Sequence, residues 1–152
     1  MDLGLNGKVA IVTGGSDGIG KAAATSLASE GAKVAIVGRT QSKLDTAIAE
    51  IKAESGGEVI GVSADVSVES SVQAMVAKVV SEFGGVDILV NNAGTSSATT
   101  LEKMTDADLE TDFGIKIYGA IYCARAALPH LKASGTGAII NTTTPGGKAA
   151  RP

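Results

Sequence analysis

A glycine-rich stretch close to the N-terminus constrains the fold of this chain more than any other feature. It reads Thr13-Gly14-Gly15-Ser16-Asp17-Gly18-Ile19-Gly20 and separates an apolar run, residues 9–12, from a segment of strong helix formers, residues 21–28. The run predicts a buried parallel strand, and the segment predicts a helix. A tight turn between a strand and a helix aims backbone N–H groups and the positive end of the helix dipole at an anion, most often a pyrophosphate.

Three glycines of this turn have separate expected roles. Gly14 permits the tight turn, Gly18 lets the phosphate approach closely, and Gly20 lets the helix pack on the strand. A glycine-rich segment by itself is equally compatible with a flexible loop. Here the strand before it and the helix after it are both predicted, which is the context that an anion-binding turn requires.

Strand and helix patterns alternate along the whole chain. Apolar runs predict strands at 8–13, 33–37, 58–64, 86–90 and 138–143, and helical patterns predict helices at 18–30, 42–54, 69–83 and 105–131. This alternation is typical of one α/β domain with a parallel, doubly wound sheet of strand order 3-2-1-4-5. We expect the site where the strand order reverses, beyond the carboxyl ends of the first and fourth strands.

The last predicted helix has an apolar stripe on one side and two internal glycines. The stripe consists of Leu109, Phe113, Ile117, Ile121, Ala124, Leu128 and Leu131. Gly114 and Gly119 each cost a helix about 1 kcal/mol relative to alanine, which the close approach of another helix would explain. Pro129 should kink or fray the end of the helix.

Composition narrows the classes of function. A net charge of −3 provides no basic surface for nucleic acid or an anionic membrane. The single cysteine, Cys123, excludes a disulfide framework and a thiolate metal site, and its apolar neighbours indicate a buried small side chain. No apolar run approaches the roughly 18 residues of a membrane span, and no cationic leader precedes one. We therefore expect a cytoplasmic protein without a metal site.

The spacing Thr-Gly-x-x-x-Gly-Ile-Gly resembles that of the short-chain dehydrogenase/reductase family. Two further motifs carry the resemblance: Asp65-Val66 after the third strand and Asn91-Asn92-Ala93-Gly94 after the fourth. The resemblance implies that the first pair contacts the adenine of a dinucleotide. It also implies that the second motif ties the central sheet together and lines the ribose side of the pocket. The expected cofactor-binding residues are Gly14, Ser16, Gly18, Ile19, Gly20, Arg39, Thr40, Asp65, Val66, Asn92, Ala93 and Gly94.

The resemblance is weaker at the catalytic positions. The family uses Asn, Ser, Tyr and Lys, and here Thr144 stands at the position of the Ser and keeps the hydroxyl that orients the substrate oxygen. Lys116 stands at the position of the Asn. It either places a second cation near the proton relay or points outward without a role, and the second alternative is preferred.

The Tyr-x-x-x-Lys pair of the family is expected about a dozen residues after Thr144, and the sequence does not contain it. Tyr118 and Tyr122 lie within the long helix and lack a lysine four residues later, so they do not replace it. We expect the chain to be the N-terminal, cofactor-binding portion of the family fold, without its last strands and helices. It is then either a fragment or completed by another chain, and it should have no dehydrogenase activity alone.

Cofactor choice is expected to depend on the end of the second strand. NAD-preferring folds of this kind place an acidic residue there, and this chain has Gly38 followed by Arg39 and Thr40. A guanidinium can bind the 2′-phosphate of NADP, and Thr40 and Ser16 can add hydroxyl donors. Asp17 argues the other way, because its carboxylate either repels the phosphate or caps the helix. We expect NADP rather than NAD, unless Arg39 is an ordinary solvated charge.

The resemblance implies an oxidoreductase that transfers hydride between NADP and a small-molecule carbonyl or secondary alcohol. It also implies a dimer or tetramer built on the helix around residues 105–131. The departures at Lys116 and Thr144 keep a second hypothesis open, a non-catalytic dinucleotide-binding sensor or scaffold of the same fold.

Overall fold

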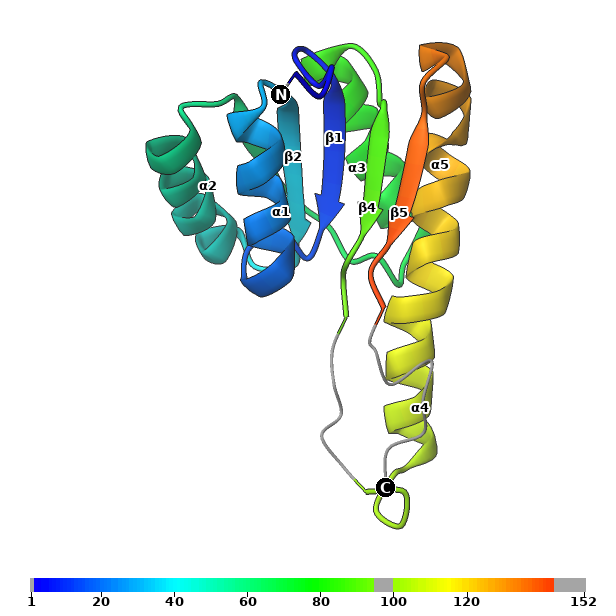
Figure 1. The fold of residues 1–152 in the computed structure, drawn as a ribbon. Coiled ribbons are helices and arrows are strands. Elements are labelled where there is room, and N and C mark those ends of the chain that lie inside the picture. The colour runs from blue at the N-terminus through cyan, green and yellow to red at the C-terminus, as the bar shows by residue number, and fades with distance from the viewer. Residues whose placement is uncertain (1, 95–99, 144–152) are drawn as a thin grey trace.

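A single parallel sheet forms the centre of the molecule. The computed structural model describes residues 2–94 and 100–143. The strands are β1 (Val9–Thr13), β2 (Lys33–Gly38), β3 (Val59–Ser63), β4 (Ile88–Asn91) and β5 (Ala138–Asn141). They pair in the order β3-β2-β1-β4-β5, all parallel (Figure 1). The predicted fold class and strand order are confirmed.

Helices cover both faces of this sheet, and alternate strand residues divide between them. Val9 and Ile11 of β1 belong to the apolar cluster on the side of α3 (Glu69–Phe83) and α5 (Gly119–Ser134). Ala10 and Val12 belong to the cluster on the side of α1 (Gly18–Ser29) and α2 (Gln41–Ser55). Because successive side chains of a strand point to opposite faces, a strand buried on both sides must be apolar throughout, as β1 is up to Thr13 at its end.

The long helix expected after the fourth strand is divided into three parts. α4 (Asp106–Phe113) is followed by a π-helical turn, η1 (Gly114–Tyr118), which continues into α5. Figure 1 shows α5 alongside β5, and α4 projecting past the carboxyl ends of the strands. A π-helical turn inside an α-helix is rare and often lies at a functional site.

Pro129 does not end this helix. α5 continues through it to Ser134 and is followed by Gly135, whose φ of 71° is the left-handed conformation common after a helix. Leu131 lies beyond the proline and is buried in the core on the α3 side, which holds the last turn in place. The expectation that the helix ends near Leu131 was three residues short for this reason.

The side of the helix that faces the core also differs from the predicted stripe. The buried residues are Ile115, Gly119, Cys123, Ala127 and Leu131. Most of the predicted stripe is exposed, by 41–53% for Leu109, Phe113, Ile117, Ile121 and Leu128. Cys123 is buried as expected, and desolvation raises the pKa of its thiol to about 12. Between Ile115 and Leu131 the inward-facing residues are small, because the helix lies close to its neighbours.

The neighbour that requires Gly119 is a loop and not another helix. A Cβ at Gly119 would lie 2.9 Å from Cγ2 of Val66, in the connection between β3 and α3. A Cβ at Gly114 would meet only Ser67, at 3.6 Å, which is an ordinary contact. The expected helix–helix explanation of these two glycines is therefore wrong for contacts within the chain.

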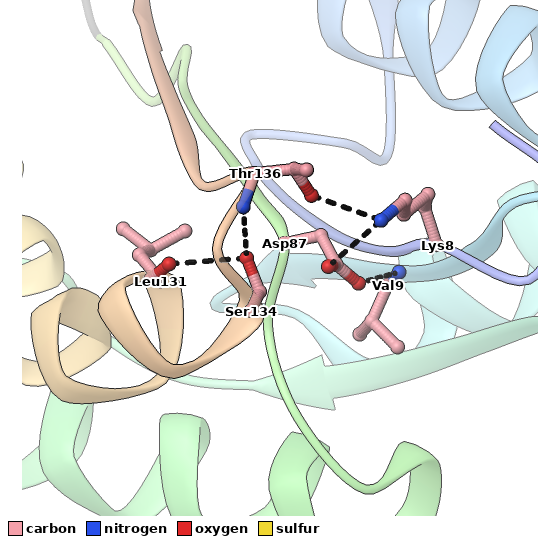
Figure 2. A network of polar contacts seen from close by, with 6 residues as sticks. All are labelled: Lys8, Val9, Asp87, Leu131, Ser134 and Thr136. Atoms are coloured by element: carbon pink, nitrogen blue, oxygen red, sulfur yellow. Dashed lines mark hydrogen bonds and ion pairs between the residues drawn. The ribbon is translucent and has the colours of Figure 1, made fainter. Parts of the chain in front are cut away.

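A polar network joins three strands at the end of the sheet opposite the expected site (Figure 2). Asp87 accepts the backbone N–H of Val9 through Oδ2, at 2.8 Å, and its Oδ1 lies 3.6 Å from Nζ of Lys8. The same ammonium donates to the hydroxyl of Thr136 at 2.9 Å, and the N–H of Thr136 donates to Oγ of Ser134 at 3.2 Å. The amino ends of β1, β4 and β5 are thereby fixed together.

Within residues 2–94 and 100–143, none of the helices combines the length and the apolar character that a bilayer crossing requires.

Candidate functional site

Thr13 holds the carboxyl ends of β1 and β4 together. Its side chain is 2% exposed, and its hydroxyl donates to the carbonyl oxygen of Val90 at 3.3 Å. The same oxygen accepts the backbone N–H groups of Asn92 and Ala93, each at 3.0 Å. These three bonds use the whole capacity of a hydroxyl group, so the backbone that leaves β4 has one defined position.

Asn92 extends this connection to the glycine-rich turn and to β5. Its Nδ2 donates to the carbonyl oxygen of Gly14 at 3.3 Å, and Oγ1 of Thr142 lies 3.2 Å from its Oδ1. The N–H of Thr142 donates to the carbonyl oxygen of Asn91 at 3.1 Å. The Asn-Asn-Ala-Gly motif therefore ties together the ends of three strands, which is the structural role expected of it.

The glycines of the turn meet different constraints. Gly14 has φ +64°, a left-handed conformation that favours glycine, and a Cβ added at Gly18 would have nothing within 4 Å of it. At Gly20 a Cβ would collide with the carbonyl group of Gly14 and approach Asn92 Nδ2 to 2.5 Å. The first turn of α1 thus rests on the preceding turn and on Asn92, and open space lies above Gly18.

Most of the expected cofactor residues line one cleft of about 420 Å³ at the carboxyl edge of the sheet. They are Gly14, Ser16, Gly18, Arg39, Thr40, Asp65, Val66, Asn92, Ala93 and Gly94. Gly20 is buried beneath the turn, and Ile19 lines the neighbouring cleft instead. The structure brings together residues from four loops that are distant in the sequence.

Charges of both signs line this cleft. Arg39 and Lys43 supply two cations, and Asp17 and Asp65 supply two carboxylates. Asp17 caps α1, since its Oδ1 accepts the N–H of Gly18 at 2.7 Å. Of the two roles considered for Asp17, capping is therefore present in the structure.

Asp65 is held by its own loop. Its Oδ1 accepts the hydroxyl of Ser67 at 2.6 Å and the N–H of the same residue at 2.9 Å. These hydrogen bonds, with a smaller contribution from the Arg39 guanidinium, hold the pKa of the Asp65 carboxyl below its usual value, against an opposing effect of burial. Asp65 is therefore ionised at neutral pH, and the positive charge of Arg39 favours this ionised form.

A second cleft of about 680 Å³ adjoins the first and shares Val66, Asn92, Ala93, Gly94 and Ile115 with it. Its lining combines amide and hydroxyl side chains from the ends of β1, β4 and β5 with apolar side chains from η1 and the start of α5. The strand-end residues are Thr13, Asn91, Asn92, Asn141, Thr142 and Thr143, and the helical ones are Ile115, Ile117, Ala120 and Ile121.

Lys116 lies in the wall of this second cleft. Its Cε would be 3.6 Å from a Cβ at Gly94, and its Nζ lies 3.4 Å from Oδ2 of Asp112. Its side chain is 46% exposed. The stem of Lys116 thus borders the second cleft while its ammonium pairs with Asp112, and the preferred expectation that this lysine has no role in the reaction stays a prediction. Thr144, the other expected catalytic residue, lies outside the described residues.

The comparison with known families agrees with this geometry. The family described as short chain dehydrogenase matches residues 8–152. The chain belongs to the short-chain dehydrogenase family. The resemblance seen in the sequence motifs is confirmed, and the family places the chain among oxidoreductases.

Individual short-chain dehydrogenases match nearly the whole chain. An uncharacterized oxidoreductase of Bacillus subtilis (strain 168), YvrD, is 37% identical over 97% of this chain and 55% of its own. The L-sorbose reductase of Gluconobacter frateurii, in a complex with NADPH and L-sorbose, is 42% identical with a TM-score of 0.87 over 93% of this chain and 54% of its own. An NAD⁺-bound xylitol dehydrogenase is 32% identical with a TM-score of 0.90 over 97% and 57%. The chain spans little more than half the length of these relatives.

Three residues of this short-chain dehydrogenase site were not singled out in the sequence. Thr13 begins the glycine motif but was given no role of its own, although a polar side chain at the end of an apolar strand was a usable signal. Gly15 was missed among its neighbours; its Cβ would lie 2.7 Å from the side chain of Ile36. Lys43 was missed because only the fold brings it, one helical turn after Arg39, into the wall of the first cleft.

Proposed function

We propose that this chain is the NADP-binding portion of a short-chain dehydrogenase that interconverts a carbonyl and a secondary alcohol. The observation that carries the proposal is the combination, in one cleft, of a glycine turn at a helix N-terminus with Arg39 and Lys43 beside Gly38. Relatives with bound NADPH and with bound NAD⁺ both exist, so the choice of NADP rests on the residues of this chain.

The glycine turn fits the pyrophosphate of a dinucleotide. The conformation of Gly14 and the absence of a side chain at Gly20 bring the N-terminus of α1 close to the end of β1. The space above Gly18 is open, and the first turn of α1 contains no acidic residue. A phosphate there would gain from the backbone N–H groups and from the helix dipole.

The surroundings of Gly38 suit a phosphate on the adenosine ribose. A Cβ at Gly38 would lie 3.6 Å from Oγ of Ser16, so the hydroxyl of Ser16 faces the end of β2. α2 begins there without a side-chain cap from Thr40 and without an acidic residue in its first turn. Arg39 and Lys43 flank this helix start, and both carry charges that complement a phosphate.

Asp17 is the residue that opposes this assignment. Its carboxylate lines the same cleft, yet it already accepts a hydrogen bond from Gly18 and is exposed to solvent. Solvent screening weakens its repulsion of a phosphate, whereas a charge-assisted hydrogen bond from Arg39 contributes about 1.5–3 kcal/mol. The balance favours the 2′-phosphate.

The residues of this chain would bind and orient the reactants. When bound, NADPH supplies a hydride, which together with a proton converts a carbonyl into an alcohol. The first cleft would hold the adenosine and the phosphates, and the shared residues Asn92, Ala93 and Gly94 would direct the reactive end of the cofactor into the second cleft. Thr144 would orient the substrate oxygen through its hydroxyl. Since the sequence has no Tyr-x-x-x-Lys pair, we expect binding without turnover from these 152 residues alone.

Calorimetric titration of the chain with NADPH and with NADH tests the proposal. We expect NADPH to bind at least about tenfold more tightly, because one charge-assisted hydrogen bond corresponds to roughly that ratio or more. Arg39→Ala should remove most of the difference. Arg125→Ala is the matched control, since this exposed arginine pairs with Glu69 at 2.9 Å and lines neither cleft.

Gly38→Asp tests the same site in the opposite direction. A side chain fits there, because its Cβ would be 3.4 Å from the nearest atom, Cδ2 of Leu44. The new carboxylate should accept a hydrogen bond from a ribose 2′-OH and repel a 2′-phosphate, so that NADH becomes the better ligand. Equal affinities for both cofactors in the unmodified chain, or a preference that Arg39→Ala leaves intact, would refute the choice of NADP.

A further inference from the structure

Lys116 gives the second cleft its charge. Among the described residues that line this cleft, it is the one charged side chain; the others are apolar, amide, hydroxyl or glycine residues. The first cleft, by contrast, contains two cations and two carboxylates. A ligand in the second cleft therefore meets a single positive charge and no negative one from these lining residues.

The position of the ammonium group is defined from two sides. The stem of Lys116 runs past Gly94, where the loop from β4 leaves the sheet, and this glycine belongs to both clefts. Nζ lies 3.4 Å from the Asp112 carboxylate one turn earlier in the helix, and Asp112 lines neither cleft. The stem of Lys116 thus lies beside a residue that both clefts share, and its ammonium lies at the rim of the second cleft beside Asp112.

The ion pair with Asp112 does not neutralise this site for a ligand. Both partners are partly exposed, and ion pairs of this kind contribute little free energy because water competes for them. An ammonium has three donors, so it can hold Asp112 and a second anion together. Arg39 and Lys43 already provide cations for the cofactor, and Lys116 is absent from the lining of the cofactor cleft.

We propose that the substrate of this dehydrogenase is an oxo acid or hydroxy acid whose carboxylate binds Lys116. This inference rests on the proposed function. The amide and hydroxyl side chains at the strand ends face the polar part of such a substrate, and the isoleucines of η1 and α5 pack on its carbon chain. Lys116 acts by holding the carboxylate, which fixes the distance between the acid group and the carbonyl that is reduced.

The test uses the chain, 4-oxopentanoate and its methyl ester, which share a ketone and differ in charge. Affinities are measured by NMR titration with and without saturating NADPH. We expect the acid to bind more tightly than the ester by up to about fivefold, since an exposed charge pair gives a modest gain. Lys116→Met should abolish this difference, and Lys116→Arg should retain it. Lys132→Met, an exposed lysine of α5 that lines neither cleft, is the matched control.

The outcomes separate this inference from the proposed function. A chain that fails to bind NADPH refutes the proposed function, while the comparison of acid and ester without cofactor still tests Lys116. Equal affinities for acid and ester in both states overturn the inference. It is also overturned if Lys116→Met weakens NADPH binding as strongly as Arg39→Ala does, because the ammonium would then serve the cofactor.

Discussion

At the scale of single residues, the site depends on polar groups that are satisfied inside the protein. Thr13 is buried and fixes the two backbone N–H groups that begin the loop after β4. If its hydroxyl were absent, Asn92 and Ala93 would each have a backbone donor without this partner. An unsatisfied buried donor costs about 1–3 kcal/mol, more than the net gain from a satisfied one.

We expect Thr13→Val to lower the free energy of unfolding by about 2 kcal/mol, because valine keeps the shape and removes the hydroxyl. Thr13→Ser keeps the hydroxyl and loses only a methyl group, which costs about 1 kcal/mol. Urea unfolding measures the two free energies. Hydrogen exchange of the Asn92 and Ala93 amides gives the deciding readout: both should exchange faster in the valine variant and stay protected in the serine variant. Equal protection in the two variants would contradict the assigned role of the hydroxyl.

Sequence patterns predict best those residues whose chemistry is local. The turn of Gly14, Gly18 and Gly20 could be predicted because a strand, a turn and a helix are contiguous in the sequence. The hydrogen bonds of Thr13 could not, since its partner Asn92 lies 79 residues later in the sequence. The position of Lys116 beside the second cleft could not be predicted for a related reason: it lies in a π-helical turn, which leaves no periodic signal in the sequence.

At the scale of elements, the helix that follows the site is shaped by the loop against which it packs. Val66 contacts the helix at Gly119 and lines both clefts. The apolar pattern of this helix has two sides: one has small residues between Ile115 and Leu131, and the other has large residues. Periodicity alone predicted a stripe of mostly large residues, of which Leu131 is buried, whereas close packing selected Gly119, Cys123 and Ala127 for the core.

Gly119→Ala and Gly114→Ala should have opposite effects on stability. Both glycines have helical backbone angles, so alanine favours the helix by up to about 1 kcal/mol at either position. At Gly119 the added methyl lies 2.9 Å from Val66, and overpacking of this kind costs about 1–3 kcal/mol. Urea midpoints should therefore fall for Gly119→Ala and rise for Gly114→Ala. A rise in both would show that the contact with Val66 relaxes freely.

At the scale of the whole molecule, the large side chains of the long helix form an exposed apolar face. We define this outer helix face as Leu109, Phe113 and Leu128, since the other two exposed side chains of the helix stripe, Ile117 and Ile121, line the second cleft. β5, at the edge of the sheet, is also exposed along its length. Apolar surfaces of this extent are typical of sites of association.

We expect the chain to self-associate through the outer helix face at micromolar concentration, as a dimer or a tetramer. Phe113→Glu should shift it toward the monomer, because an unpaired carboxylate cannot be buried without a large penalty. Leu101→Glu is the control, since Leu101 is 87% exposed and lies outside this face. Size-exclusion chromatography with light scattering measures the mass. A monomer in the unmodified chain, or an equal shift in both variants, would count against this interface.

The strand order also has a consequence for the order in which the molecule can assemble. β2 pairs with β1 on one side and with β3 on the other across short connections, all within residues 9–63. On its other side β1 pairs with β4, where Ala10 lies opposite Ile88, a residue 78 positions later in the chain. Closing so long a loop costs more entropy than closing the short ones. During synthesis, the half of the sheet that carries the glycine turn and Arg39 is therefore free to form first, and the second cleft is completed only after β4 and β5 have emerged.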